Sequence, residues 1–487
     1  MADRILVLDA GTTSTRAMLF SARGRMEGMA QAELTQHYPR PGWVEHDAGE
    51  IWDKTLACMR EVTGGTGEGI AAIGITNQRE TVVAWDCKTG EALARAIVWQ
   101  DRRTADFCAR LKEAGHEDEV QQRTGLLLDP YFSATKMRWL LDEDEAVRGA
   151  AATGRLAFGT VESWLVFKLS GGAHLSDASN ASRTLLMALD GDGFDEGLCD
   201  LFGVPQATLP QITDTHGTLS EAKAEWLGSA IPICGLVGDQ QSATIGQGCL
   251  TIGATKATYG TGAFVLTNKG AEIPRSGHRL LGTVLHQHAG KRVYALEGSA
   301  FVAGSLVQYL RDQLGLIGDA AETEALARSI PDSGEVVIVP ALAGLGAPHW
   351  KPEARGVISG LSFASGRAQI ARAALEAMAH QTHDLASAFA ADGAAWRELK
   401  IDGGMSANDW MAQDLADMLN LPVERPDFVE TTALGAAICA AVGAGLHAGL
   451  DDAVEAMRGP SRRFEPAMES AVRSARLERY RLALSVA

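Results

Sequence analysis

The sequence predicts an α/β protein built from two similar halves. Short apolar runs alternate along the whole chain with longer segments of helical spacing, a pattern typical of α/β architecture. The chain has 487 residues, more than one hydrophobic core usually serves. A strand, a Gly–Thr turn and a second strand occur in each half, as ILVLDAGTTSTRAMLF at 5–20 and KATYGTGAFVLTN at 256–268.

The individual elements follow from these patterns. The apolar runs predicted as strands are 4–8, 16–20, 71–76, 81–85, 256–259, 263–267, 335–340 and 397–402. The segments predicted as helices are 50–62, 103–114, 300–314, 367–391, 408–419 and 431–445, with a closing helix within 468–487. In 300–314, for example, Phe301, Leu306 and Leu310 recur at helical spacing.

The segment 238–253, GDQQSATIGQGCLTIG, is rich in glycine and predicts a hinge. We therefore place a domain boundary near residue 246, which gives an N-terminal domain at 1–246 and a C-terminal domain at 247–487. Two similar domains that face each other would put two phosphate-binding hairpins across a cleft.

Net charge and composition limit the classes of molecule that the protein is expected to bind. Lys and Arg number 44 against 61 Asp and Glu, a net charge of −17, which disfavours nucleic acid and anionic membranes and favours a small substrate. The seven cysteines form no Cys-x-x-Cys pair, so neither a disulfide framework nor a zinc site is indicated. The first residues lack the features of a signal peptide, and the bland stretch 434–450 is short and interrupted by His447. These features predict a cytoplasmic protein without membrane insertion.

The turn after the first strand has the composition of a phosphate cradle. Gly11 permits a tight hairpin and close approach of a ligand to the backbone. The side chains of the turn that can donate to phosphate oxygens are Thr12, Thr13, Ser14 and Arg16. Asp9 repels an anion unless a divalent cation lies between them, which predicts Mg²⁺. The structural alternative is a threonine-rich hairpin in which Asp9 caps the turn.

Other stretches suit a small polyol. Arg79 and Glu80 in ITNQRET pair a donor with an acceptor, as neighbouring hydroxyls require, although a plain ion pair has the same composition. Trp99 can pack on a carbon skeleton and Tyr131 can bond a hydroxyl, or both can be core residues.

Asp239 in GLVGDQQSA follows an apolar strand and is the best candidate for a general base, with Gln240 orienting the substrate. Its structural alternative is a helix cap.

Together these stretches resemble the glycerol kinases of the FGGY carbohydrate-kinase family, within the actin-like ATPase superfamily. The motifs that carry the resemblance, in chain order, are DAGTTSTR, YPRPGWVEHD, ITNQRET, VWQDRRT, GLLLDPYFSATK, NASRTLL, GDQQSA, TYGTGAF, ALEGSAF, LAGLGAPHW, DGGMSAN and TALGAA. The resemblance implies two ribonuclease-H-like domains that flank a catalytic cleft. It also implies phosphoryl transfer from ATP to glycerol, with ADP as product, Mg²⁺ as cofactor and a homo-oligomer, dimer or tetramer, as the assembly.

The resemblance assigns roles by position. The residues it implies for glycerol are Arg79, Glu80, Tyr131, Asp239 and Gln240, with Trp99 and Phe264 along the carbon backbone. Those it implies for the nucleotide are Thr12, Thr13, Ser14, Arg16, Thr261, Gly304, Gln308, Gly404 and Asn408. Asp9 and Asp239 would face the metal ion, and Asp239 would be the general base.

The chain also departs from the family. Ala10 stands where many glycerol kinases have glutamine, and segment 224–232 lacks the Gly-rich, Arg-bearing loop of fructose-1,6-bisphosphate inhibition. Two other readings stay open at this point: a kinase of another small polyol or a pentulose, and a non-catalytic actin-like ATP-binding module. Retention of both Asp9 and Asp239 argues against the non-catalytic reading, because a pure binder needs no base.

Overall fold

The first sheet is built mainly from the N-terminal part of the chain and has six strands. The structure, a computed structural model, describes residues 3–487. In spatial order the strands are β11 (His216–Ala222), β12 (Ile231–Gly238), β5 (Ile70–Asn77), β1 (Arg4–Ala10), β2 (Ser14–Ser21) and β3 (Met26–Glu33). β1, β2 and β3 form an antiparallel meander, while β5 runs parallel to β1 and β12 runs parallel to β5.

The second sheet has seven strands and repeats this order. In spatial order the strands are β15 (Leu281–His288), β16 (Lys291–Ala300), β14 (Ala263–Gly270), β13 (Thr255–Tyr259), β19 (Leu399–Asp402), β20 (Val423–Pro426) and β21 (Ser461–Phe464). The β13–β14 hairpin corresponds to β1–β2, and β19 lies parallel to β13 as β5 lies parallel to β1. The duplication predicted from the two strand–turn–strand units is therefore present in the topology.

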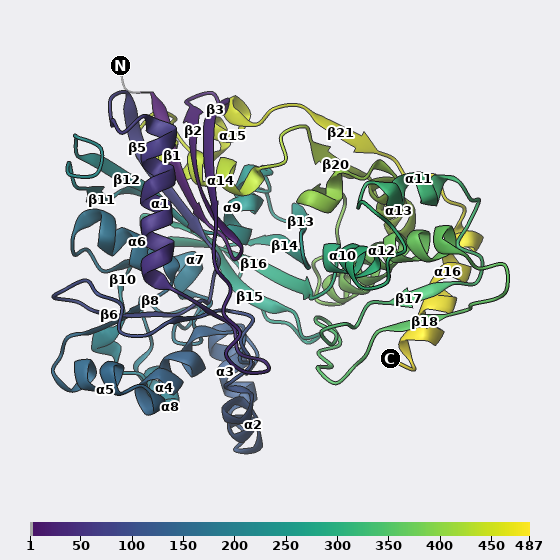
Figure 1. Ribbon diagram of the computed structural model, residues 1–487, viewed down its shortest axis with the longest axis horizontal. Helices are drawn as coiled ribbons and strands as arrows, with labels where there is room; N and C mark the ends of the chain where they lie inside the picture. The colour runs from purple at the N-terminus through teal and green to yellow at the C-terminus, as the bar shows by residue number, and fades with distance from the viewer. Residues whose placement is uncertain (1–2) are drawn as a thin grey trace.

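Short strands and helices complete the chain (Figure 1). The strands of the small two-stranded sheets are β4 (Glu45–His46), β6 (Val83–Asp86), β7 (Ala96–Ile97), β8 (Leu156–Gly159), β9 (Leu175–Asp177), β10 (Gln211–Thr213), β17 (Val337–Val339) and β18 (Val357–Ser359). The helices before β13 are α1 (Ala48–Thr63), α2 (Ala105–Glu113), α3 (Glu117–Thr124), α4 (Ser133–Glu143), α5 (Glu145–Ala152), α6 (Val161–Ser170), α7 (Ala178–Ala181), α8 (Glu196–Phe202) and α9 (Asp239–Gly246). The later helices are α10 (Gly304–Asp312), α11 (Glu322–Arg328), α12 (Arg367–Ala391), α13 (Asp409–Leu419), α14 (Thr431–Gly443), α15 (Leu450–Met457) and α16 (Ser470–Leu484). The 3₁₀ turns are η1 (Gln206–Thr208) and η2 (Gly404–Ala407).

Helices cover both faces of the first sheet, which explains why β1 is apolar at successive positions rather than at alternate ones. Leu6 and Leu8 belong to the core that includes residues of α1 and α6. Ile5 and Val7 belong to the core on the other face, which includes residues of α14. A strand that is buried on both faces has no solvent side on which polar residues could alternate.

α9 and α14 lie between the two sheets (Figure 1). α9 contacts β5 and β12 of the first sheet and β13, β14 and β15 of the second. The predicted hinge at 238–253 thus contains a helix, and glycine serves close packing there. A Cβ on Gly435 of α14 would lie 1.8 Å from Ser242 O, and one on Gly246 would lie 2.1 Å from Thr431 O.

The predicted strands and helices all overlap observed elements. The predicted helix at 300–314 begins only at Gly304, because 291–300 form the long strand β16. Within residues 3–487 no helix combines the length and the apolar character that a bilayer crossing requires.

The close contact of α9 with α14 leads to a stability prediction. Gly435→Ala would force Cβ against a backbone carbonyl and should destabilise the protein by about 1–3 kcal/mol, because the backbone cannot move aside as a side chain can. Gly149→Ala is the matched control, since Gly149 lies within α5 and a Cβ there meets nothing within 4 Å. It should stabilise by about 0.5–1 kcal/mol. Urea unfolding midpoints of both variants test this, and an unchanged midpoint for Gly435→Ala would contradict it.

Candidate active site

A cavity of about 170 Å³ lies where the two halves meet. It is small beside the roughly 300–1,000 Å³ of pockets for drug-sized ligands. Its lining residues are Thr12, Arg79, Glu80, Trp99, Gln100, Tyr131, Asp239, Gln240, Thr258, Gly260, Thr261, Gly262, Phe264 and Phe301. The structure thus brings together every residue predicted for the substrate, along with one threonine from each hairpin.

Arg79 and Glu80 follow β5, and each is only 2% exposed. Glu80 has a φ of 60°, uncommon for a residue with a side chain and often found at functional sites. Its carbonyl oxygen accepts a hydrogen bond from Ser133 Oγ at 3.1 Å. The turn therefore points two adjacent charged side chains toward the same cavity.

Arg79 belongs to a buried charge network that joins the two sheets. Its Nη1 and Nη2 donate to the Glu297 carboxylate on β16 at 2.6 and 3.2 Å. Arg183 also bridges two carboxylates, donating to Glu80 Oε1 at 2.6 Å and to Glu297 Oε1 at 2.9 Å. Burial raises the pKa of Glu297, but Arg183 and Arg79 outweigh burial and hold that pKa below its usual value. The network thus joins two guanidinium groups to the carboxylates of Glu80 and Glu297, and Asp239 adds a third carboxylate beside Arg79.

Asp239 begins α9 at the end of β12. The backbone N–H of Gly238 donates to Ser179 Oγ at 2.9 Å, and a Cβ on Gly238 would lie 2.8 Å from Arg79 Cδ. Asp239 Oδ1 lies 3.1 Å from Arg79 Nε, and about 30% of the Asp239 side chain stays exposed. Burial raises the pKa of Asp239 to about 6, although Arg79 acts in the opposite direction. Such a carboxylate is ionised at neutral pH and still basic enough to take a proton.

Gln240 is the next residue of α9 and is 8% exposed. Its Oε1 accepts a hydrogen bond from Lys256 Nζ at 2.5 Å. Lys256 lies on β13, is fully buried, and also donates to Thr258 Oγ1 at 2.8 Å. A lysine therefore stands directly behind two of the side chains that line the cavity.

Aromatic rings form one wall of the cavity. The centroid of the Trp99 ring lies 5.5 Å from that of Tyr131 and 6.1 Å from that of Phe264, both in edge-to-face geometry. Trp99 Nε1 donates to Thr12 Oγ1 at 2.9 Å, which links this wall to the first hairpin. Burial raises the pKa of Tyr131 far above its usual value, so its hydroxyl stays protonated.

The two Gly–Thr hairpins face the same cavity through Thr12 and Thr261. The first closes with Gly11 N donating to Ser14 O at 3.0 Å, and the second with Gly260 N donating to Gly262 O at 2.9 Å. Thr13 lies in the first turn but does not line the cavity.

Arg16 and Asp9 pair with each other beside the first hairpin. Arg16 Nη2 donates to Asp9 Oδ2 at 2.5 Å and Arg16 Nη1 donates to Glu430 Oε2 at 2.6 Å. Asp9 is 3% exposed and does not line the cavity. Across residues 3–487 no cluster of three or more His, Cys, Asp or Glu side chains is arranged to hold a metal ion. Few carboxylates lie near the hairpin, and Arg16 already binds one oxygen of Asp9. These residues fit a Mg²⁺ ion that is held by one or two carboxylates together with substrate phosphates, and they do not fit an ion held by protein ligands alone.

The predicted nucleotide residues of the C-terminal half lie beside the second hairpin. A Cβ on Gly304 would lie 2.6 Å from Gly260 O. Gln308 is exposed one turn later on α10, and Gly404 is exposed at the start of η2. Asn408 caps α13 by accepting from Met411 N at 2.9 Å, so its oxygen has a structural task.

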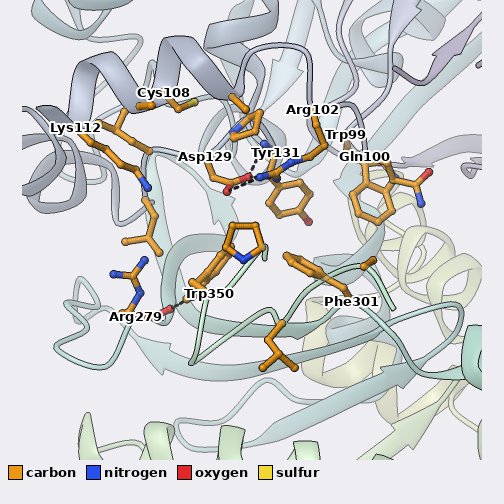
Figure 2. Close-up of a pocket in the computed structure, with 18 of the residues that line it drawn as sticks. Trp99, Gln100, Arg102, Cys108, Lys112, Asp129, Tyr131, Arg279, Phe301 and Trp350 are labelled. Carbon is orange, nitrogen blue, oxygen red and sulfur yellow. Dashed lines mark hydrogen bonds and ion pairs between the residues drawn. The ribbon is translucent and has the colours of Figure 1, made fainter. Parts of the chain in front are cut away.

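A second cavity of about 580 Å³ adjoins the first and shares Trp99, Gln100, Tyr131, Phe264 and Phe301 with it. Figure 2 shows the side chains that line it, with Cys108 and Lys112 of α2 across from Arg279 and Trp350. The pair Arg102–Asp129, at 2.7 Å, lies between them. This mostly apolar cavity therefore shares the aromatic wall with the polar cavity.

Sequence reasoning gave no role to Glu297, Arg183, Lys256 or Thr258. Glu297 and Arg183 lie in motifs that carried the resemblance, ALEGSAF and NASRTLL. A lone charge within an otherwise apolar strand signals a buried partner, because an unpaired buried charge is too costly to keep. That signal was available for Glu297 and for Lys256.

Removing Glu297 should damage the buried network severely. Glu297→Gln removes the one carboxylate that both Arg79 and Arg183 contact, and breaking a buried pair in this way costs about 3–5 kcal/mol. The matched control is Arg138→Gln, which breaks the exposed pair with Asp142 at 2.6 Å and should cost roughly 0–1 kcal/mol. Thermal melting compares the two, and similar losses of stability would refute a special role for the network.

Two sequence models of one family match the chain in succession. The N-terminal domain of the FGGY family of carbohydrate kinases matches residues 4–246, and the C-terminal domain matches residues 255–444. A glycerol kinase of Aromatoleum aromaticum is 52% identical over 99% of this chain and 98% of that relative, and one of Rhodospirillum centenum is 52% identical over 97% and 96%. The crystal structure of Plasmodium falciparum glycerol kinase with ADP superposes with a TM-score of 0.93 at 33% identity, covering 99% of this chain and 97% of that one. The chain therefore belongs to the FGGY family of carbohydrate kinases.

Proposed function

We propose that this protein transfers the γ-phosphoryl group of ATP to a primary hydroxyl of glycerol, giving sn-glycerol 3-phosphate and ADP. The observation that carries the proposal is Asp239, a carboxylate with a raised pKa in a small cavity that both Gly–Thr hairpins face. Relatives named glycerol kinase, about 52% identical over nearly the whole chain, support the choice of substrate.

The cavity suits a three-carbon polyol. Glu80 offers carboxylate oxygens to hydroxyl protons, while Arg79 and the Gln240 amide supply N–H donors. Trp99 and Phe264 bring apolar ring surface to the carbon skeleton and limit the length of the substrate. A five-carbon sugar would need this aromatic wall to open.

Asp239 supplies the chemistry. Its carboxylate accepts the proton of the attacking hydroxyl as that oxygen bonds to the γ-phosphorus and the bond to the β-phosphate oxygen breaks. Negative charge develops on the β-phosphate oxygen of the departing ADP. Thr12 and Thr261 line the cavity from the two hairpins, and their hydroxyls and backbone N–H groups can stabilise that charge. Catalysis is then mainly positioning, since the reactants are held in line.

Asp9 and Asp239 are the carboxylates that we propose for the metal side of the site. Mg²⁺ bound with the nucleotide would neutralise phosphate charge during transfer. Arg16 holds Asp9 in place, and Thr13 and Ser14 provide further hydroxyls for the phosphates. The adenosine would meet Gly304, Gln308, Gly404 and Asn408. The Asn408 amide nitrogen donates one N–H to Thr323 Oγ1 at 3.3 Å and has a second N–H for the ligand.

The homo-oligomeric state and the cytoplasmic location stay predictions. Consumption of ATP supports a compartment in which ATP is abundant.

Release of ADP in a coupled assay with Mg-ATP tests the function. Glycerol should give turnover, while erythritol, xylulose and ribulose should give at least tenfold less at equal concentration because the aromatic wall excludes them. Dihydroxyacetone, which has the same length, is the matched control for substrate size. Turnover with a pentulose but not with glycerol would overturn the assignment.

The raised pKa of Asp239 predicts how the rate depends on pH. Asp239 must be ionised to act as a base, so kcat/KM should fall about tenfold per pH unit below its pKa of about 6. An unperturbed aspartate would lose activity only near pH 4. Asp239→Asn should abolish turnover at every pH but still bind ATP, as measured by calorimetry. Near-normal turnover of this variant would remove Asp239 as the base.

A further inference from the structure

Lys256 carries an arrangement that the proposed reaction does not yet explain. Its side chain is fully buried on β13, on the face that packs against α9. Its Nζ donates to Gln240 Oε1 at 2.5 Å and to Thr258 Oγ1 at 2.8 Å. Both acceptors belong to side chains that line the 170 Å³ cavity. A buried lysine is expensive to keep, so its contacts call for a reason.

The chemistry of an ammonium group fixes how these two partners must be oriented. A lysine ammonium donates hydrogen bonds and accepts none. The Gln240 side chain must therefore turn its carbonyl oxygen toward Lys256, which sends its amide N–H groups the other way. Within residues 3–487 the Gln240 Nε2 donates to no protein atom. The Thr258 oxygen likewise accepts from Lys256, which leaves its own hydrogen for another acceptor.

The charges around Lys256 keep it an ammonium at neutral pH. Burial lowers the pKa of Lys256 to about 8, while Asp402, Asp239 and Glu297 favour the charged form and Arg79 opposes it. Asp402 is also held by other donors, Thr431 Oγ1 at 2.7 Å and Gln247 Nε2 at 3.0 Å. Lys256 is therefore one part of a network and has its closest contacts on the cavity side.

We propose that Lys256 is a positioning residue that sets the polarity of the substrate cavity. It forces Gln240 to present N–H donors to the polyol and Thr258 to present its O–H toward the transferring phosphoryl group. Glu80 and Asp239 present acceptors to the same cavity, so the substrate meets both donors and acceptors there. This proposal rests on the proposed polyol kinase function and adds a residue that never touches the substrate.

Variants of Gln240 test the polarity directly. Gln240→Glu keeps an oxygen for Lys256 but has no donor for the substrate, and Gln240→Met has neither. If the amide donates to the polyol, both variants should raise the KM for glycerol by about 10–100-fold, the loss expected when a buried hydrogen bond is broken. The KM for ATP should change less than threefold. A glycerol KM for Gln240→Glu within twofold of the wild type would overturn the proposal.

Lys256→Met then tests whether the lysine acts through Gln240. The variant should raise the glycerol KM in the wild-type background but add nothing in the Gln240→Met background, because the group that Lys256 orients is already gone. A purely structural lysine would give equal effects in both backgrounds, which would overturn the proposal. If Lys256→Met does not fold, the glycerol KM of Gln240→Glu against the wild type decides, because this variant keeps the acceptor for Lys256 and loses only the donor.

Lys400→Met is the matched control. Lys400 lies opposite Lys256 in the neighbouring strand β19 and donates to Gln247 O at 3.1 Å, away from the cavity. Its replacement should lower the melting temperature and leave the glycerol KM unchanged.

Thr258→Val should lower kcat with little effect on the glycerol KM, and an unchanged kcat would remove Thr258 from the proposal. Turnover of the wild-type protein with glycerol is measured first, and its absence would overturn the proposed function. If the wild type turns over glycerol and Gln240→Glu has an unchanged glycerol KM, only the polarity proposal is overturned.

Discussion

The pairing of Arg79 with Glu297 is the contact on which the site depends. Arg79 follows a strand of the first sheet and Glu297 lies within a strand of the second. The pair is fully buried, so separating it would strand two charges in a medium that solvates them poorly. The pair thereby fixes the separation of the two sheets beside the cavity that Asp239, Glu80 and Gln240 line. The geometry of the cavity follows from this pairing more than from the surrounding loops.

Asp239 shows how stability and reactivity oppose each other in this site. Arg79 favours its ionised form, while burial and the nearby Glu80 disfavour that form, and the net effect raises its pKa. A carboxylate fully paired with arginine would be too weak a base to accept a proton from an alcohol. Without Arg79, burial and Glu80 would raise the pKa of Asp239 further. The single contact with Arg79 Nε, at 3.1 Å, places Asp239 between these limits.

Much of the fold was predictable from the sequence because local signals were strong. β1 and β2 are apolar runs on both sides of a turn that needs Gly11, and the same pattern recurs at β13 and β14. Several strands escaped prediction, among them β3, β15 and β16, since their mixed composition is explained only by pairing with neighbouring strands. The glycines at 238–253 predict a hinge, and α9 lies within that segment. Only the partner helix α14 shows why they are there.

Some residues of the candidate site were likewise predictable from the sequence and others were not. Residues in recognisable stretches, such as Arg79 and Asp239, were predicted and do line one cavity. The roles predicted for the site residues, in binding substrate, nucleotide and metal and in catalysis, stay predictions, and the larger cavity beside them had no signal in the sequence. Glu297 contacts Arg79 from the other sheet and Lys256 contacts Gln240 of α9, and no local pattern states which distant residue a buried charge will meet.

The glycine contacts of α9 and α14 bear on how members of this family can be recombined. Gly435 is required by the carbonyl of Ser242, and Gly246 by the carbonyl of Thr431. Each glycine lies in one half of the chain and its constraint lies in the other. A chimera joined near residue 246 would therefore pair an α9 from one parent with an α14 from another, and a single misplaced methyl group would push these two helices apart. The two halves look like modules in the sequence, but they can be exchanged only if these two helices are exchanged together.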